Sequence, residues 1–124
     1  MASILRVNTL TDTSSNNSTP MATVASGSAK SWIKYNGTGT IAITDSFNVA
    51  SITDETTGTT TVTFTSAMDN ANYSIKAQNS ENALHIQVVS ANQATSAYRQ
   101  RTLDGGGSLA DDPAVYGDTH GDSA

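Results

Sequence analysis

Hydrophobic and polar residues alternate in short runs through the middle of the chain. Between Ser31 and Tyr73 the β-branched and aromatic residues form small groups, and turn-forming residues separate them. Such alternation, with Asn, Asp and Gly between the groups, is typical of antiparallel strands joined by short connections. The pattern predicts strands over 31–35, 40–44, 47–54, 60–65, 73–78 and 84–89. No helix of normal length is expected.

The connections between these strands carry their own signals. Asn36-Gly37 predicts a tight hairpin, because both residue types tolerate positive φ angles. Asp45-Ser46 and residues 57–59 predict two more turns. Towards the C-terminus, residues 94–103 and 111–117 are expected to form two further strands. Pro113 inside the last of these favours an edge position, since proline cannot donate a ladder hydrogen bond.

The N-terminal part differs from the rest. Residues 2–11 form a strand-like arm, and residues 12–20 contain no apolar side chain apart from a final proline. Residues 21–29 are expected to form a second extended segment. The apolar residues of the arm, predicted to serve assembly or anchoring, are Ile4, Leu5, Val7 and Leu10. The arm either lies along a neighbouring subunit or attachment surface, or forms an edge strand of the same sandwich.

These patterns predict an all-β protein with an antiparallel β-sandwich or jelly-roll-like body. We divide the chain into an extended N-terminal arm and polar linker over 1–29 and the β-sandwich body over 30–124. Trp32 is the only tryptophan, and it is expected to anchor the core. The full set of predicted core aromatics is Trp32, Tyr35, Phe47, Phe64 and Tyr73.

Composition limits the kinds of partner that the chain can bind. The 124 residues carry a formal net charge of −5, and the six Lys and Arg residues are scattered along the chain. Without a basic patch, nucleic acid is a poor partner. No apolar run is long enough to span a bilayer, and no secretory signal is recognised, so we expect no membrane partner. The chain contains no cysteine, which excludes disulfide and thiolate chemistry.

Candidate chemistry is sparse. Asp45 and Asp54 could form an acid pair for glycoside cleavage, but their sequence context favours turn-forming roles. His85 is predicted to be a half-exposed strand residue. Three copies of His120 around a three-fold axis could ligate a divalent ion, an alternative that stays open. The Gly-rich segment 104–108 lacks the strand, lysine and helix of a phosphate-binding loop and is expected to be a turn. We therefore expect no enzymatic activity and no cofactor.

One segment combines an aromatic side chain with hydrogen-bonding groups. This segment is expected to form either a glycan-binding surface or a contact between subunits. Its residues are Tyr98, Arg99, Gln100 and Arg101.

Three longer segments occur in order and at natural spacing. They are W-I-K-Y-N-G-T-G-T over 32–40, T-D-S-F-N-V-A-S-I-T-D over 44–54 and T-V-T-F-T-S-A-M-D-N-A-N-Y over 61–73. Together they resemble a recurring module of fibre and spike proteins in the virions of tailed bacteriophages. The ending V-Y-G-D over 115–118 also resembles the closing strand of that module, although here it is shorter and less apolar.

The resemblance implies a structural virion protein, a short tail-fibre-like or head-fibre-like spike that contributes to host-surface attachment. It implies a homotrimer that is assembled in the bacterial cytoplasm and resides in the virion. The implied partners are copies of itself, capsid or tail proteins and a host-surface glycan. Two alternatives remain: a capsid decoration or cement protein without a receptor role, and, less favoured, a polysaccharide depolymerase.

Overall fold

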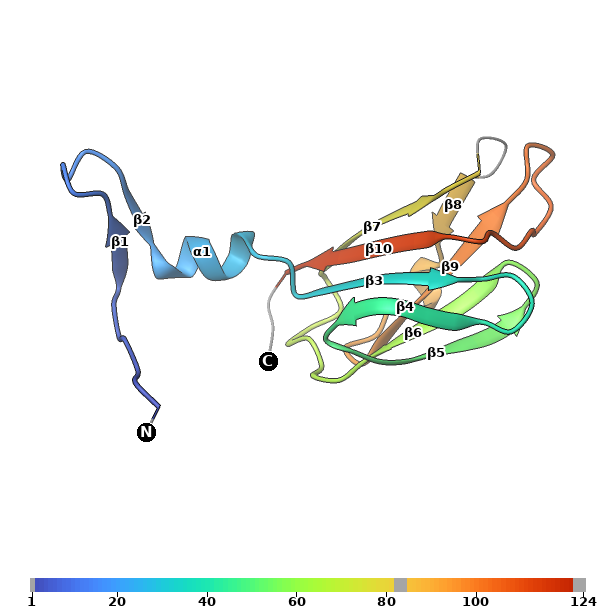
Figure 1. Ribbon diagram of the computed structural model, residues 1–124, viewed down its shortest axis with the longest axis horizontal. Coiled ribbons are helices and arrows are strands. Elements are labelled where there is room, and N and C mark those ends of the chain that lie inside the picture. The colour runs from blue at the N-terminus through green and yellow to red at the C-terminus, as the bar shows by residue number, and fades with distance from the viewer. Residues whose placement is uncertain (1, 82–84, 122–124) are drawn as a thin grey trace.

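Two four-stranded antiparallel sheets pack face to face to form the body of the protein (Figure 1). The computed structural model describes residues 2–81 and 85–121. The first sheet has the order β4-β3-β10-β7 and contains β3 (Ser31–Asn36), β4 (Ala42–Phe47), β7 (Ser74–Asn79) and β10 (Val115–His120). The second has the order β5-β6-β9-β8 and contains β5 (Val49–Thr56), β6 (Thr59–Phe64), β8 (His85–Val88) and β9 (Ala97–Leu103). The predicted all-β sandwich is confirmed.

The core lies between the two sheets and follows the two-residue period of the strands. In β3, Ile33 and Tyr35 point inward, and in β6 Val62 and Phe64 do the same. The Phe64 ring meets the Tyr73 ring edge-on, with centroids 5.6 Å apart. The predicted core positions Tyr35, Phe64 and Tyr73 are therefore confirmed. The buried hydrophobic residues are Ile33, Tyr35, Val62, Phe64, Met68, Tyr73, Tyr98 and Val115.

Two predicted core residues lie on the surface instead. Trp32 and Phe47 are both exposed, so the prediction that they anchor the core is wrong. The reason is the strand period: Ser31 and Ile33 point inward, and Trp32 between them must point outward. The Ser31 hydroxyl is buried against that of Thr119, with 2.8 Å between the two oxygens.

Two predicted turns differ in detail. The turn predicted over Asn36-Gly37-Thr38-Gly39 is found in the connection 37–41, but it is longer than a tight Asn-Gly hairpin, and the positive φ of 62° belongs to Gly39. Asp45 and Ser46, predicted as a turn, lie inside β4. The reversal falls at Asn48, with a φ of 55°.

Asn48 stabilises this reversal through its side-chain amide. The amide nitrogen donates to the Lys30 and Ser66 carbonyls, and the amide oxygen accepts a 2.7 Å hydrogen bond from the Ser66 N–H. The β4–β5 connection is therefore fixed to the rest of the body. The turn predicted over 57–59 is confirmed between β5 and β6, where Gly58 has a φ of 64°.

The closing strand was expected at an edge over 111–117, which is wrong. β10 lies in the middle of its sheet and pairs with β3 on one side and β7 on the other. Pro113 precedes the strand and therefore removes no ladder hydrogen bond. The strand predicted over 94–103 is confirmed as β9, and that over 84–89 as β8. Leu84 lies outside the described residues.

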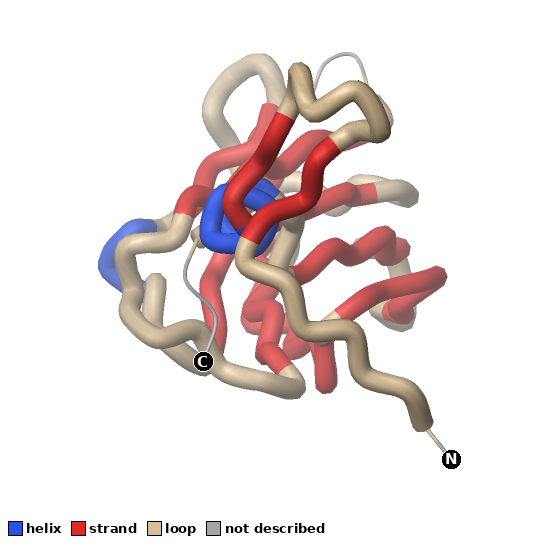
Figure 2. The backbone as a smooth tube through the Cα atoms, turned by 90° about the vertical axis from the view of Figure 1, so that its left-hand side faces the viewer, coloured by secondary structure: helices blue, strands red, loops and turns tan. Residues whose placement is uncertain are grey.

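The N-terminal part forms a separate protrusion. β1 (Thr9–Thr11) and β2 (Ser18–Pro20) make a small hairpin that joins neither large sheet, followed by helix α1 (Met21–Gly27). A short 3-10 helix, η1 (Ser90–Asn92), precedes β9. The hairpin and α1 project from one end of the sandwich (Figure 1), and a view from that end looks along α1 (Figure 2).

The extended segment predicted over 21–29 is wrong for residues 21–27, which are helical. Pro20 immediately precedes the helix, where its missing N–H costs no intrahelical bond. At the C-terminal end of the helix, both the backbone N–H and the hydroxyl of Ser28 donate to the Val24 carbonyl.

Candidate functional site

Three large aromatic side chains lie on the outer surface of the first sheet. Trp32 on β3 is 40% exposed, Phe47 on β4 is 53% exposed and Tyr116 on β10 is 40% exposed. We call the outward-facing surface of this sheet the aromatic face. Its side chains are Trp32, Lys34, Asp45, Phe47, Lys76, Gln78, Tyr116 and Asp118.

Strand register brings these side chains into two rows across the sheet. In the first row Trp32 stands opposite Phe47 on one side and Asp118 on the other. Directly opposed side chains on one sheet face are close enough to contact each other. The two aromatic residues therefore form one continuous apolar patch at the β3–β4 side of the face.

In the second row Lys34 stands between Asp45 on β4 and Tyr116 on β10. The Lys34 ammonium lies 5.5 Å from the centre of the Tyr116 ring, within range of a cation–π interaction. Such contacts hold the tyrosine ring against the sheet. Tyr116 thus continues the aromatic patch towards the middle of the face.

The charges of the aromatic face are balanced. Lys34 and Asp45 are register partners, as are Lys76 and Asp118. The four formal charges sum to zero, whereas the whole chain carries −5. At the edge of the face, His120 Nδ1 lies 3.2 Å from Asp118 Oδ2.

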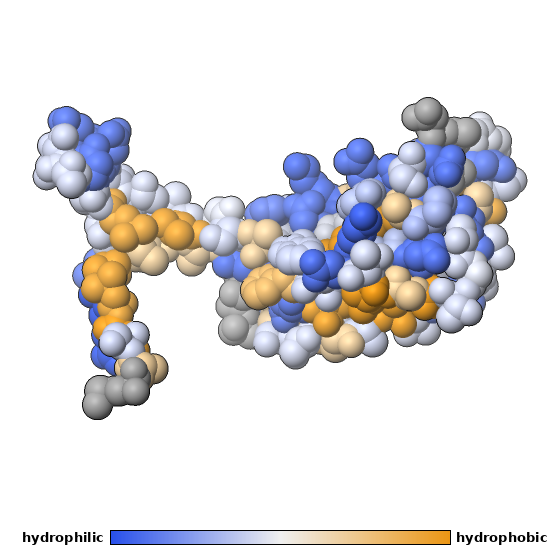
Figure 3. Space-filling view, in the orientation of Figure 1, coloured by the Kyte–Doolittle hydropathy of each residue, from blue (hydrophilic) through white to orange (hydrophobic). Residues whose placement is uncertain are grey.

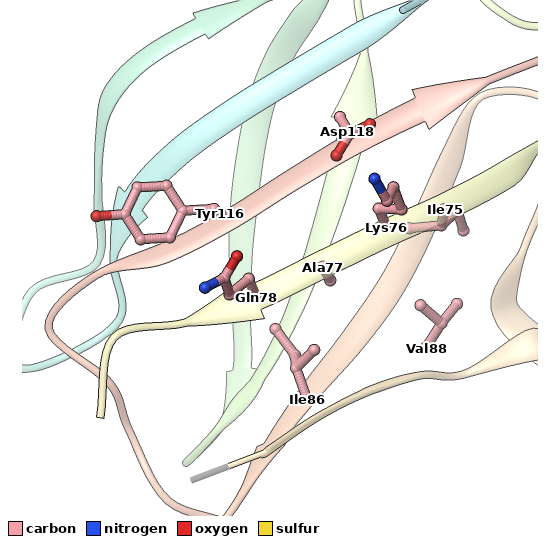
Figure 4. A pocket seen from close by; sticks show the side chains of 8 residues that line it. All are labelled: Ile75, Lys76, Ala77, Gln78, Ile86, Val88, Tyr116 and Asp118. Carbon is pink, nitrogen blue, oxygen red and sulfur yellow. The ribbon is translucent and has the colours of Figure 1, made fainter. Parts of the chain in front are cut away.

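A cavity opens where edge strands β7 and β8 of the two sheets separate. It has a volume of about 410 Å³. Ile86 and Val88 point from β8 towards β7 on its inner side (Figure 4). Ile75 and Ala77 of β7 also line it, and four residues of the aromatic face contribute at the outer side: Lys76, Gln78, Tyr116 and Asp118. The cavity therefore has an apolar side and a polar rim.

The outer surface of the second sheet, which we call the polar face, has a different character. The Thr61 hydroxyl donates to Glu55 Oε1 over 2.7 Å, and the Arg99 guanidinium lies 2.9 Å from the same oxygen. Arg99 also donates to the Thr61 hydroxyl. The hydrogen bond from Thr61, together with Arg99, outweighs desolvation and holds the pKa of Glu55 below its ordinary value. These polar groups satisfy one another.

The predicted glycan-binding strip does not form as such. Tyr98 and Gln100 are fully buried, so only Arg99 and Arg101 of the strip point outward, onto the polar face. The cause is again the two-residue period of the strand. The Gln100 side-chain amide donates to the Tyr35 hydroxyl over 2.7 Å, and burial raises the pKa of the Tyr98 hydroxyl. The prediction that Tyr98 and Gln100 form a surface is wrong.

The arm exposes the apolar residues that the sequence singled out. Leu5 is 83% exposed, and the other three are also exposed: Ile4, Val7 and Leu10. The Met21 N–H donates a 2.9 Å hydrogen bond to the Asn8 carbonyl, next to the β1–β2 hairpin. Hydrophobic residues along the arm and on the front of the body are visible in the space-filling view (Figure 3). The arm thus has apolar surface that its own chain leaves uncovered.

The candidate catalytic residues are dispersed. Asp45 lies within β4 and Asp54 within β5, so both turn-forming predictions are wrong, and the two carboxylates belong to different sheets. His85 begins β8 and His120 ends β10. Within residues 2–81 and 85–121, no three side chains of the His, Cys, Asp or Glu type gather into a possible metal site.

The segment 104–108 forms the predicted turn. Asp104 Oδ1 accepts 2.9 Å hydrogen bonds from the Gly106 and Ser108 N–H groups. Gly107 has a φ of 85°, a conformation that glycine adopts without strain. The turn therefore satisfies its own backbone donors and serves as a connection between β9 and the loop that leads to β10.

Asp112, which sequence reasoning placed in a strand, is a buried loop anchor. Its carboxylate accepts hydrogen bonds from the Ser80 hydroxyl at 2.7 Å, the Ala114 N–H at 2.7 Å and the Glu81 N–H at 3.1 Å. Burial opposes ionisation, but these hydrogen bonds outweigh it and lower the pKa of the Asp112 carboxyl. Its contacts with Ser80 and Glu81 leave no local sequence signal, because these partners lie 32 and 31 residues earlier in the chain.

The exposed position of Trp32, by contrast, did have a signal. The alternation S-W-I-K-Y-N places Trp32 on the same side of the strand as Lys34, and a lysine rarely points into a core.

Comparison with known proteins finds no matching family model, no similar curated protein and no similar solved structure. Among the described residues, neither helix is long and apolar enough to cross a membrane.

Proposed function

We propose that this protein is a structural component of a tailed-phage virion, a short fibre or spike whose arm attaches it and whose β-sandwich contributes to host-surface attachment. The observation that carries the proposal is the arm. It projects from one end of the sandwich and exposes Ile4, Leu5, Val7 and Leu10. Apolar side chains held away from their own core are suited to packing against another protein.

The three sequence segments that resemble fibre modules support the same proposal. They lie at β3 and its following loop, at β4 and β5, and at β6 and the chain leading to Tyr73. They therefore supply the framework of the sandwich. A polysaccharide depolymerase would need a pair of carboxylates at one groove. Asp45 and Asp54 lie on different sheets, which favours a binding or structural role over this alternative.

The shape of the molecule supports separate roles for its two ends. If the arm attaches the subunit, the opposite end of the sandwich faces outward. That end carries the connections 37–41, 57–58 and 104–114. Loops held by a rigid sheet framework commonly carry binding functions. Copies on one particle would gain affinity for a surface through multivalency.

The first test is incorporation into particles. Phage carrying the wild-type chain would be compared with phage carrying the double change Ile4→Asp and Leu5→Asp, by mass spectrometry and cryo-electron microscopy of purified virions. We expect the double variant to be lost from virions, because charged side chains cannot pack on an apolar surface. The matched control is Ser14→Asp with Ser15→Asp in the exposed β1–β2 connection, which should incorporate normally. Absence of the wild-type chain from virions overturns the proposal.

The second test concerns host attachment. Purified full-length protein would be added to host cells before infection, and adsorbed phage would be counted. We expect the protein to bind cells and reduce adsorption. If it is present in virions but neither binds cells nor competes, the receptor role fails. Loss of particle stability in its absence would then favour the capsid decoration role.

A further inference from the structure

We propose that the aromatic face is a self-association surface, covered in solution by a second copy of this chain. This inference goes beyond the virion role and does not depend on it. It begins with Trp32 and Phe47, which lie side by side on adjacent strands and are 40% and 53% exposed. Phe47 has no polar group, so its exposure gains nothing from water.

Within the body, the large exposed hydrophobic side chains are concentrated on one sheet. Among the described residues, the exposed large hydrophobic side chains of the sandwich strands are Trp32, Phe47 and Tyr116. All three belong to the aromatic face, and none to β5, β6, β8 or β9. Scattered exposed apolar residues need no explanation, whereas a cluster on one sheet face is typical of an interaction site. Aromatic residues are also the ones enriched at the centres of protein interfaces.

Charge favours a second copy as the partner. Two copies of a chain with a net charge of −5 repel each other in general. The aromatic face is an exception, because Lys34 and Lys76 balance Asp45 and Asp118. Each copy therefore offers both signs of charge to the other. Approach through this face is not opposed by the acidic character of the chain.

Area indicates how strong the contact is. Each strand of this sheet has six residues. From strand rise and spacing, the face measures roughly 20 by 20 Å, or about 400 Å². A standard interface buries about 800 Å² on each partner, so the face supplies about half of it. An interface of this size is typical of weak, concentration-dependent association.

A saccharide is the other occupant that such a face could hold, because aromatic rings and hydrogen-bonding groups suit sugars. The aromatic patch is centred on Trp32 and Phe47, whereas the cavity and its polar rim lie at the β7 side. A sugar would bring hydroxyl groups to Phe47, which has no polar group to bond them. A second copy brings the same apolar patch and both signs of charge, which is why we favour it.

Trp32 provides the readout, since it is the only tryptophan. Full-length protein would be studied by sedimentation velocity and tryptophan fluorescence over a concentration series from nanomolar to tens of micromolar. We expect an oligomer at high concentration with blue-shifted Trp32 emission and reduced quenching by acrylamide. Dilution should give a monomer with red-shifted emission, because the isolated chain leaves the indole exposed.

Phe47→Ser is the main variant, because it keeps the reporter. We expect its association to be weakened by about 30-fold or more, the effect of losing a central interface residue. Leu109→Ser is the matched control: Leu109 is also 40% exposed, but it lies in the connection after β9, outside the aromatic face. Its association should equal that of the wild type. Circular dichroism and thermal melting at low concentration would show that both variants fold.

Three results would overturn the inference. The first is a wild-type chain that is monomeric throughout, with exposed Trp32 emission. The second is association that survives both Phe47→Ser and Trp32→Ser in folded protein. The third is a monomer whose Trp32 emission shifts on adding purified host polysaccharide, which assigns the face to a saccharide. Because virion incorporation is measured separately, failure of this inference is distinguishable from failure of the proposed function.

Discussion

The two outer faces of the sandwich cover the same core but differ in whether their side chains find partners within the chain. On the polar face, Thr61, Glu55 and Arg99 bond to one another within 3.1 Å. On the aromatic face, Trp32 and Phe47 leave large apolar surfaces in water. A side-chain network that satisfies itself needs no partner, whereas exposed apolar surface gains free energy from one. This difference is the reason that we place the proposed contact on the aromatic face.

The largest loss of stability is expected from a substitution on the inner side of β10, a strand whose outer side belongs to the aromatic face. A Cβ at Gly117 would lie 2.6 Å from the Tyr98 hydroxyl oxygen. We expect Gly117→Ala to lower the free energy of unfolding by about 3 kcal/mol, since a buried ring must move. The neighbouring change Tyr116→Ala removes an outward side chain and should cost under about 1 kcal/mol in the monomer. Urea denaturation at low concentration measures both, and equal costs would contradict the assignment of inner and outer sides.

The second effect concerns Asp112, which belongs to neither face. Its lowered pKa means that the folded state favours the carboxylate. The resulting stability is complete above the unfolded pKa of about 3.9 and is lost as the pH falls through the folded value. We expect Asp112→Asn to cost about 2 kcal/mol at pH 7 and to flatten the acid dependence below pH 4. Melting temperatures between pH 2 and 7 test this, and an unchanged acid limb in the variant would contradict it.

The third effect tests the outward position of Trp32 in the isolated chain. We expect Trp32→Ser to cost about 1 kcal/mol in dilute monomer, because it removes an exposed side chain opposite Phe47 and leaves no internal cavity. The measurement is chemical denaturation followed by circular dichroism at submicromolar concentration. A cost of about 3–5 kcal/mol, typical of truncating a core aromatic, would show that Trp32 is buried in the monomer.

The smallest effect is expected on the polar face. Glu55→Gln removes the charge that faces Arg99 but keeps an oxygen that can accept the Thr61 hydrogen bond. Exposed ion pairs contribute little to stability, so the melting temperature should change least of the four cases. Oligomeric state should not change at all. A dissociated Glu55→Gln variant would show that the polar face, rather than the aromatic face, mediates association.

Much of the fold could be predicted from local pattern, because a strand needs only its own alternation and a turn needs only its own residues. The strands around Ile33, Val62 and Tyr98 were found in this way. The sequence-based predictions were wrong where a local pattern was compatible with two structures. Asp45-Ser46 resembles a turn in sequence but lies inside β4, because Asn48 gains three side-chain hydrogen bonds by making the reversal three residues later.

The candidate site was predicted less well than the fold. The apolar arm was visible in the sequence, since a polar linker isolates it. The aromatic face was not predicted, because aromatic character suggested burial for Trp32 and Phe47 although the strand alternation places Trp32 on the same side as Lys34. Tyr98 failed in the opposite direction: its polar neighbours suggested a surface, yet strand period places Tyr98 and Gln100 inside and Arg99 and Arg101 outside.

The sequence by itself determined the all-β class, the apolar arm and the acidic, cysteine-free character of this protein. These properties depend on composition and on neighbouring residues. Tertiary structure alone decided that β10 lies between β3 and β7, which brings Tyr116 beside Lys34. It also decided that Asp112 meets Ser80 and Glu81. Such pairings join residues that are far apart in the chain, and only the strand order of the first sheet brings them together.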